Sequence, residues 1–154
     1  LSMGVEAEAL LFASARADLL RTVVQPAIEA GRTVVSDRTV FSSLAYQGFR
    51  SGTNRMNAVW AANELATSQW TMLPDLVLQI DLDAETALSR RSGRGGDDRM
   101  EAVTDSEELI SGFNQVRQGL HSELHAYNTT WVKIDGLASP DEVFEEMVDA
   151  VERF

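Results

Sequence analysis

Hydrophobic residues recur along the chain at two spacings, one typical of helices and the other of buried strands. Helical spacing predicts long helices over 5–29, 54–68, 106–127 and 140–153, and shorter ones over 42–47 and 84–91. Near-continuous apolar runs predict strands over 33–35, 75–83 and 130–135. The run over 75–83 is typical of a parallel strand covered on both faces.

Residues at the ends of these segments indicate where the elements begin and end. Pro26 is expected to kink or divide the first helix, and Gly31 is a suitable residue to follow its end. Ser139 and Pro140 are a suitable N-cap and first turn for the last helix. Strands that alternate with helices predict an α/β domain with a parallel sheet and right-handed crossovers.

The length suits a single domain, 1–154. Three strands are few for a sheet covered on both faces, and the chain begins at Leu1 in a helical pattern rather than at Met. We therefore expect the chain to be a fragment whose N-terminal part, with further strands, is absent.

Composition excludes several classes of protein. The apolar fraction of 44% and the charged fraction of 24% are those of a soluble globular protein, and no apolar run is long enough to span a membrane. A net charge of −11 argues against binding to nucleic acid or to anionic lipid. The lack of cysteine excludes disulfides and is compatible with the cytoplasm, where we expect the protein.

Reactive side chains follow the first predicted strand, in the stretch SDRTVFSSLAYQG that begins at Ser36. Ligands of open α/β sheets bind beyond the carboxyl ends of the strands, where Asp37 and Arg38 are expected. An arginine there binds phosphate through two hydrogen bonds, and an adjacent aspartate orients a metal-bound water or a second arginine. A simple surface Asp–Arg pair is an equally good interpretation of these two residues alone.

A second basic stretch lies at 90–99, where four arginines and three glycines occur within ten residues. Such a loop is suited to close over a polyphosphate and to stabilise charge on a phosphoryl group in transfer. The plainer alternative is a solvated loop. Its place directly after a strand and a helix favours the first interpretation.

A third pair, Phe12 and Arg16, is spaced four residues apart and therefore shares one face of the first helix. A phenylalanine beside an arginine could stack on a base and hydrogen-bond its edge. Taken alone, Phe12 is more simply a core residue.

Together, these stretches resemble bacterial thymidylate kinases. SDRTVFSSLAYQG is similar to that family's Asp-Arg-(aromatic)-x-x-Ser-Ser-x-Ala-Tyr-Gln-Gly segment, and EALLFASARADLL to its Glu-Ala-Leu-Leu-Phe-x-x-x-Arg helix. PDLVLQIDLDAETALSRR and RGGDDRME are similar to its Asp-ended strand and its lid. The order and spacing agree from about Glu6 to the end. The resemblance implies a nucleoside-monophosphate-kinase-like fold of the P-loop class, with helices flanking a parallel sheet and a lid at about 91–100.

The resemblance also implies an acceptor site for dTMP. Phe12 would stack on the thymine, and Arg16 would contact the carbonyl edge of the base. Ser43 would lie beside the base. Tyr46 would exclude a 2′-hydroxyl group from the sugar, and Gln47 would support the site.

The remaining implied roles concern phosphate, metal and catalysis. Arg38 would bind the monophosphate, and Asp37 would lie near the phosphates and Mg²⁺ as a metal ligand and catalytic residue. Arg50 would help to bind the acceptor. Arg90 and Arg94 would bind ATP and neutralise its phosphates in the transition state. The reaction implied is transfer of the γ-phosphoryl group of ATP to dTMP, giving dTDP in nucleotide biosynthesis.

The resemblance further implies a homodimer formed by helix packing, for which 23–30 and 54–68 offer apolar faces. Nucleotides are the only other partners expected.

Two departures from the family pattern are visible. Thr39 replaces the aromatic residue that follows Asp-Arg, and the phosphate-binding loop Gly-x-x-x-x-Gly-Lys-Ser/Thr does not occur. The only lysine is Lys133, in a predicted strand. We therefore expect this polypeptide by itself not to turn over ATP. Another nucleoside monophosphate or deoxynucleoside kinase, and a kinase-derived module that only binds a nucleotide or dimerises, stay open as alternatives.

Overall fold

The computed structural model describes residues 3–49, 55–68, 72–92, 106–119 and 128–154. The first helical run has three parts, namely α1 (Val5–Leu19), the π-helical turn η1 (Leu20–Val24) and α2 (Gln25–Glu29). The other helices are α3 (Val40–Tyr46), α4 (Met56–Ala66), α5 (Ala84–Ser92), α7 (Ser106–Gly119) and α9 (Pro140–Arg153). These elements match most of the predicted helices to within a few residues.

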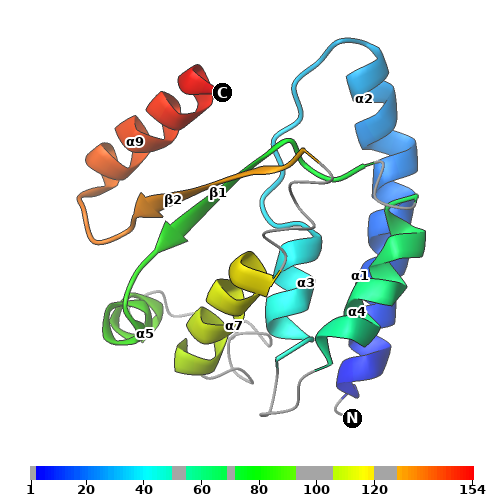
Figure 1. Ribbon diagram of the computed structural model, residues 1–154, viewed down its shortest axis with the longest axis horizontal. Coiled ribbons are helices and arrows are strands. Elements are labelled where there is room, and N and C mark those ends of the chain that lie inside the picture. Colours follow the sequence, from blue (N-terminus) through cyan, green and yellow to red (C-terminus); the bar gives the residue numbers. More distant parts are fainter. Residues whose placement is uncertain (1–2, 50–54, 69–71, 93–105, 120–127) are drawn as a thin grey trace.

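Two parallel strands, β1 (Leu76–Asp81) and β2 (Thr130–Asp135), form the sheet of the described part of the chain. Leu76 lies opposite Thr130, and Asp81 lies opposite Asp135, so the two carboxyl ends meet at one edge. Figure 1 shows α9 on one side of these strands and α3 and α7 on the other. The prediction of an α/β fold with a parallel sheet and flanking helices is confirmed.

The first helix is divided where Pro26 predicts it. Proline has no backbone N–H, and its ring crowds the carbonyl group four residues earlier. The turn directly before it is widened to π geometry, and the Gln25 N–H donates to the Leu20 carbonyl oxygen, five residues back. Single π turns of this kind occur inside α-helices, and helix bends are found both at them and at proline. The prediction that Pro26 interrupts the helix is therefore confirmed.

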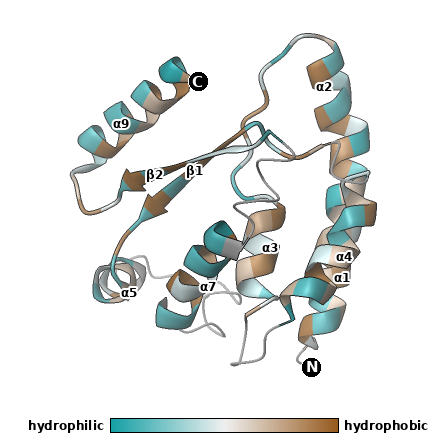
Figure 2. Cartoon of the chain, in the orientation of Figure 1, coloured by the Kyte–Doolittle hydropathy of each residue, from teal (hydrophilic) through white to brown (hydrophobic). Residues whose placement is uncertain are grey.

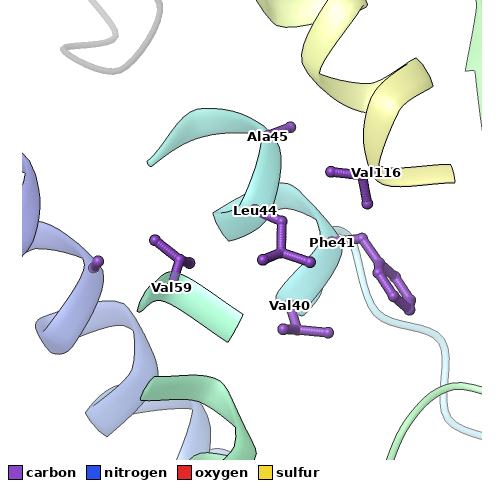
Figure 3. Close-up of a cluster of buried hydrophobic side chains, with 7 residues drawn as sticks. Val40, Phe41, Leu44, Ala45, Val59 and Val116 are labelled. Atoms are coloured by element: carbon purple, nitrogen blue, oxygen red, sulfur yellow. The ribbon is translucent and has the colours of Figure 1, made fainter. Parts of the chain in front are cut away.

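The hydrophobic core is centred on α3 (Figure 3). Its buried side chains come from four helices and are Ala9, Val40, Phe41, Leu44, Ala45, Val59 and Val116. The Phe41 ring also packs edge-on against Trp131 of β2, with 5.0 Å between ring centroids. Because α3 is held from several sides, the polar residues at its two ends have a rigid support.

The predicted strand over 33–35 is wrong. In the described part of the chain residues 32–36 form no strand, and Val35 is 93% exposed. A strand needs a neighbour that completes its hydrogen-bond ladder. Within the described residues, β1 and β2 pair only with each other. A short apolar run alone was therefore not enough to predict a strand at 33–35.

The expectation that both faces of 75–83 are covered is also not met. Ile80 is 50% exposed, and the other residues of β1 are only partly buried. β1 nevertheless begins and ends within the predicted range, and β2 matches its prediction over 130–135.

The last helix begins as its sequence predicts. The Glu142 backbone N–H donates to the Ser139 hydroxyl oxygen, while the Ser139 N–H donates to the Glu142 carboxylate. This reciprocal capping box satisfies groups that would otherwise lack partners at the helix start. No helix in the described part of the chain is long and apolar enough to cross a membrane. The predicted helical residues 120–127 and the lid residues 93–100 lie outside the described residues.

Candidate functional site

Helices α1, α3 and α4 pack against one another and carry most of the predicted acceptor-site residues. Phe12 and Arg16 lie on α1, and Ser43, Tyr46 and Gln47 lie on α3 or at its end. The structure thus brings together two segments that are about thirty residues apart in the chain.

Arg16 is the residue that joins the three helices. Its guanidinium group donates to the Ser43 hydroxyl oxygen at 2.9 Å and to the Thr39 carbonyl oxygen at 3.4 Å. It also donates to the side-chain oxygen of Asn63 on α4. Burial lowers the pKa of the Arg16 guanidinium from its ordinary value, but arginine stays charged at neutral pH. Arg16 is therefore a partly buried cation, and its three hydrogen bonds within the described residues leave other N–H donors of the guanidinium group unused there.

Arg38 and Tyr46 form a second contact. The Arg38 Nη1 donates to the Tyr46 hydroxyl oxygen at 2.6 Å, and the guanidinium carbon lies 5.1 Å from the centroid of the ring. Arg38 has a φ of 73°, in the left-handed region that side-chain-bearing residues rarely adopt. Such backbone conformations cluster at binding sites. The predicted phosphate-binding residue and the predicted sugar-selecting residue thus touch directly.

Phe12 and Asp37 occupy more open positions. The Phe12 side chain is 43% exposed, so it is not the enclosed core residue that its plainer interpretation suggests. Asp37 is exposed in the bend before α3. Among the described residues, no group of three or more His, Cys, Asp or Glu side chains is placed to hold a metal ion.

Gln47 pairs with Glu8, which is part of the family motif but was given no role in the sequence interpretation. Its Nε2 donates to the Glu8 carboxylate of α1 at 2.9 Å, and the two side chains are 1% and 3% exposed. Glu8 lies four residues before Phe12 and eight before Arg16. The Glu8–Gln47 and Arg16–Ser43 hydrogen bonds therefore join α1 to α3 on either side of Phe12.

Replacing Glu8 with alanine is expected to destabilise the protein by about 2 kcal/mol, because it leaves a buried amide donor unpaired. A Glu8→Gln variant keeps an acceptor and is expected to lose less. Thermal unfolding measures both effects. The control is Glu6→Ala, since Glu6 is 67% exposed and its ion pair with Arg55 is worth little. Equal losses in the Glu6 and Glu8 alanine variants would contradict this role of the buried pair.

Asn63 is the other residue that the sequence interpretation missed. It lies on α4 and is completely buried, and its side chain contacts Arg16. A signal was available, because an amide amid the apolar stretch MNAVWAANELA is unusual unless it has a polar partner. Nothing in the sequence, however, identifies that partner.

Three predicted residues, namely Arg50 of the acceptor site and the lid arginines Arg90 and Arg94, are not tested by these contacts. Arg50 and Arg94 lie outside the described residues. In the described part of the chain, Arg90 is exposed on α5, which packs against α7. Its assignment to ATP binding stays a prediction.

Comparison with known proteins supports the resemblance along nearly the whole chain. The profile of the family described as thymidylate kinase matches residues 2–147. The thymidylate kinase of Thermoanaerobacter sp. (strain X514) is 35% identical over 147 residues, which are 96% of this chain and 68% of that protein. That of Halothermothrix orenii is 34% identical over 97% of this chain and 69% of its own length.

The thymidylate kinase of Geobacillus thermodenitrificans is 38% identical over 94% of this chain and 61% of its own length. The matches thus cover almost all of this sequence and about two thirds of the relatives. With the parallel strands and the α1–α3 cluster already described, they establish that the chain belongs to the thymidylate kinase family.

Proposed function

We propose that this protein is a cytoplasmic kinase that transfers the γ-phosphoryl group of ATP to dTMP, and that the cluster on α1 and α3 is its acceptor site. Family membership carries the choice of reaction. It favours dTMP over other nucleoside monophosphates, and a catalyst over a module that only binds a nucleotide. The observation that supports the location is the Arg16–Ser43 contact, because it joins the two segments predicted to surround the base.

The chemistry of the cluster suits a pyrimidine nucleotide. Phe12 offers a partly exposed ring for stacking, and Arg16 offers a charged donor for a carbonyl oxygen. Arg38 lies directly before α3 and would bind the phosphate. Tyr46, held against Arg38, would lie beside the sugar and exclude a 2′-hydroxyl group. The enzyme would act by positioning and charge stabilisation, as phosphoryl transfer requires.

ATP and a divalent metal ion are the cofactors that the family implies. Mg²⁺ at such sites is held mainly by phosphate oxygens and water, with one or two carboxylates. A single exposed carboxylate, Asp37, therefore fits a role in holding it, and the ion would neutralise phosphate charge. Arg90 and Arg94 are the basic residues proposed to act on the phosphates of ATP, and Arg50 is proposed to help to bind the acceptor. The one lysine of the sequence, Lys133, lies in β2 and pairs with Asp81. It is therefore not part of a phosphate-binding loop, and we still expect this polypeptide by itself not to turn over ATP.

Calorimetric binding of nucleotides to the chain tests the acceptor site without requiring turnover. We expect dTMP to bind, and ribothymidine 5′-monophosphate to bind at least about tenfold more weakly, since one clash or unpaired polar group costs about 1–3 kcal/mol. Thymidine is expected to bind more weakly than dTMP because Arg38 loses its phosphate. Tighter binding of dAMP, dGMP or dCMP, or no binding of dTMP, would contradict the proposal.

We also propose that two copies of the chain associate through exposed apolar residues over 23–30 of the first helical run and on α4. Over 23–30, Val23 is 55% exposed and Ile28 is 56% exposed. Figure 2 shows hydrophobic positions on α2 although this helix extends away from the strands. On α4, Leu65 is 87% exposed. A homodimer through these helices agrees with the resemblance, and sedimentation equilibrium is the direct measurement.

A further inference from the structure

The position of Asn63 in the protein interior carries a cost in stability. Asn63 has no exposed surface, and a buried amide loses stability unless its polar atoms are hydrogen-bonded. Both ends of this amide are paired. Its Nδ2 donates to the Val59 carbonyl oxygen at 2.7 Å, and its Oδ1 accepts from the Arg16 Nη1. Because the Val59 carbonyl can only accept, the amide oxygen must face Arg16.

All the hydrogen-bond partners of Arg16 are uncharged groups. They are the amide oxygen of Asn63, the hydroxyl oxygen of Ser43 and the carbonyl oxygen of Thr39. Within the described part of the chain, no carboxylate forms an ion pair with Arg16, whereas Arg21, Arg55 and Arg153 each pair with one. The protein thus orients this guanidinium group without neutralising it.

We infer that Asn63 is a positioning residue, which orients the Arg16 guanidinium group toward the base. Because Asn63 is neutral, the full charge of Arg16 stays available to the 4-oxo group of the pyrimidine. The inference rests on the proposed acceptor site. An oxygen at position 4 of the pyrimidine ring accepts a hydrogen bond from an N–H group, and a charged donor strengthens that hydrogen bond. A 4-amino group is a donor and would face the donors of Arg16. Asn63 therefore contributes to the preference for 4-oxo over 4-amino pyrimidines.

The matched ligands for a test are dTMP and 5-methyl-2′-deoxycytidine 5′-monophosphate, which have the same sugar, phosphate and 5-methyl group. In the unaltered protein we expect dTMP to bind more tightly. In Asn63→Leu we expect dTMP to bind about tenfold more weakly, the loss of one well-oriented hydrogen bond to a charged group. The affinity for the 4-amino nucleotide is expected to change less than threefold, so that the preference falls.

Two further variants separate positioning from general loosening of α4. Asn63→Asp keeps the shape of the side chain and an acceptor for Arg16 but adds a negative charge that neutralises the guanidinium group. We therefore expect this variant also to lose part of the preference for dTMP over the 4-amino nucleotide. Thr67→Val removes a buried hydroxyl group at the C-cap of α4, four residues after Asn63, which donates to the Asn63 backbone carbonyl oxygen. This control is expected to keep the preference, and thermal unfolding reports whether each variant is folded.

Each outcome has one consequence. If the unaltered protein prefers dTMP and folded Asn63→Asp or Asn63→Leu keeps that preference in full, the role of Asn63 is wrong while the proposed function stands. If Thr67→Val lowers the preference as much as Asn63→Leu, the effect is structural and the inference is overturned. If the unaltered protein does not prefer dTMP, the proposed acceptor site fails and the inference fails with it.

Discussion

Replacing Gly48 with alanine is expected to lower the stability of the protein by about 3 kcal/mol, the upper part of the usual range for overpacking. A Cβ atom at this position would lie 2.2 Å from the Leu44 carbonyl oxygen and 3.3 Å from the Met56 side chain. The first of these contacts is with backbone, so no side-chain rotation relieves it. The last turn of α3, which carries Tyr46 and Gln47, must move instead.

Thermal unfolding measures the Gly48 effect, and a fall in Tm of about 10 °C is expected for a domain of this size. Binding of dTMP is expected to weaken as well, because Tyr46 is displaced. The matched control is Gly112→Ala on α7, where a Cβ atom would meet its nearest neighbour, the Ala45 carbonyl oxygen, at 3.4 Å. Alanine also favours a helix interior over glycine. A Gly48→Ala protein as stable as Gly112→Ala would contradict the predicted collision.

Replacing Arg16 with methionine is expected to weaken dTMP binding at least about 100-fold, equivalent to about 3 kcal/mol for a charged hydrogen bond and its geometry. Methionine fills similar space but donates no hydrogen bond. The change also leaves the buried side chains of Asn63 and Ser43 without the donor that joins them. A loss of stability is therefore expected beside the loss of affinity.

Isothermal titration with dTMP measures the Arg16 effect. Arg21→Met is the control for a general change in charge, because Arg21 is 73% exposed and pairs only at the surface with Asp18. Arg16→Lys tests geometry, since lysine keeps the charge but lacks the planar fork, and we expect it to bind dTMP weakly as well. Unchanged affinity in Arg16→Met would remove Arg16 from the proposed site.

Elements with strong local signals were predictable. The apolar runs at 75–83 and 130–135 contain β1 and β2, and the Ser139–Glu142 pattern marks the start of α9. Pro26 marks an interruption of the first helical run, because proline lacks the N–H that would bond to a carbonyl group one helical turn earlier. Each of these signals depends on residues that are close together in the chain.

The strand predicted at 33–35 shows where such signals stop. Val34 and Val35 favour an extended backbone by themselves. Whether it becomes a strand depends on a distant partner, which hydrophobicity does not encode. The same limit applies to Ile80, whose exposure depends on what packs over the sheet.

For the site, the sequence by itself determined the family and the kinds of side chain available: a ring and a guanidinium group on one helix, and Asp-Arg and Tyr-Gln-Gly around another. Only the tertiary structure decided their partners. Arg16 bonds to Asn63, 47 positions away, and Gln47 to Glu8, 39 positions away. Hydrogen-bond geometry is fixed by how α1, α3 and α4 pack around the shared core, and that packing depends on the whole chain at once rather than on any local pattern.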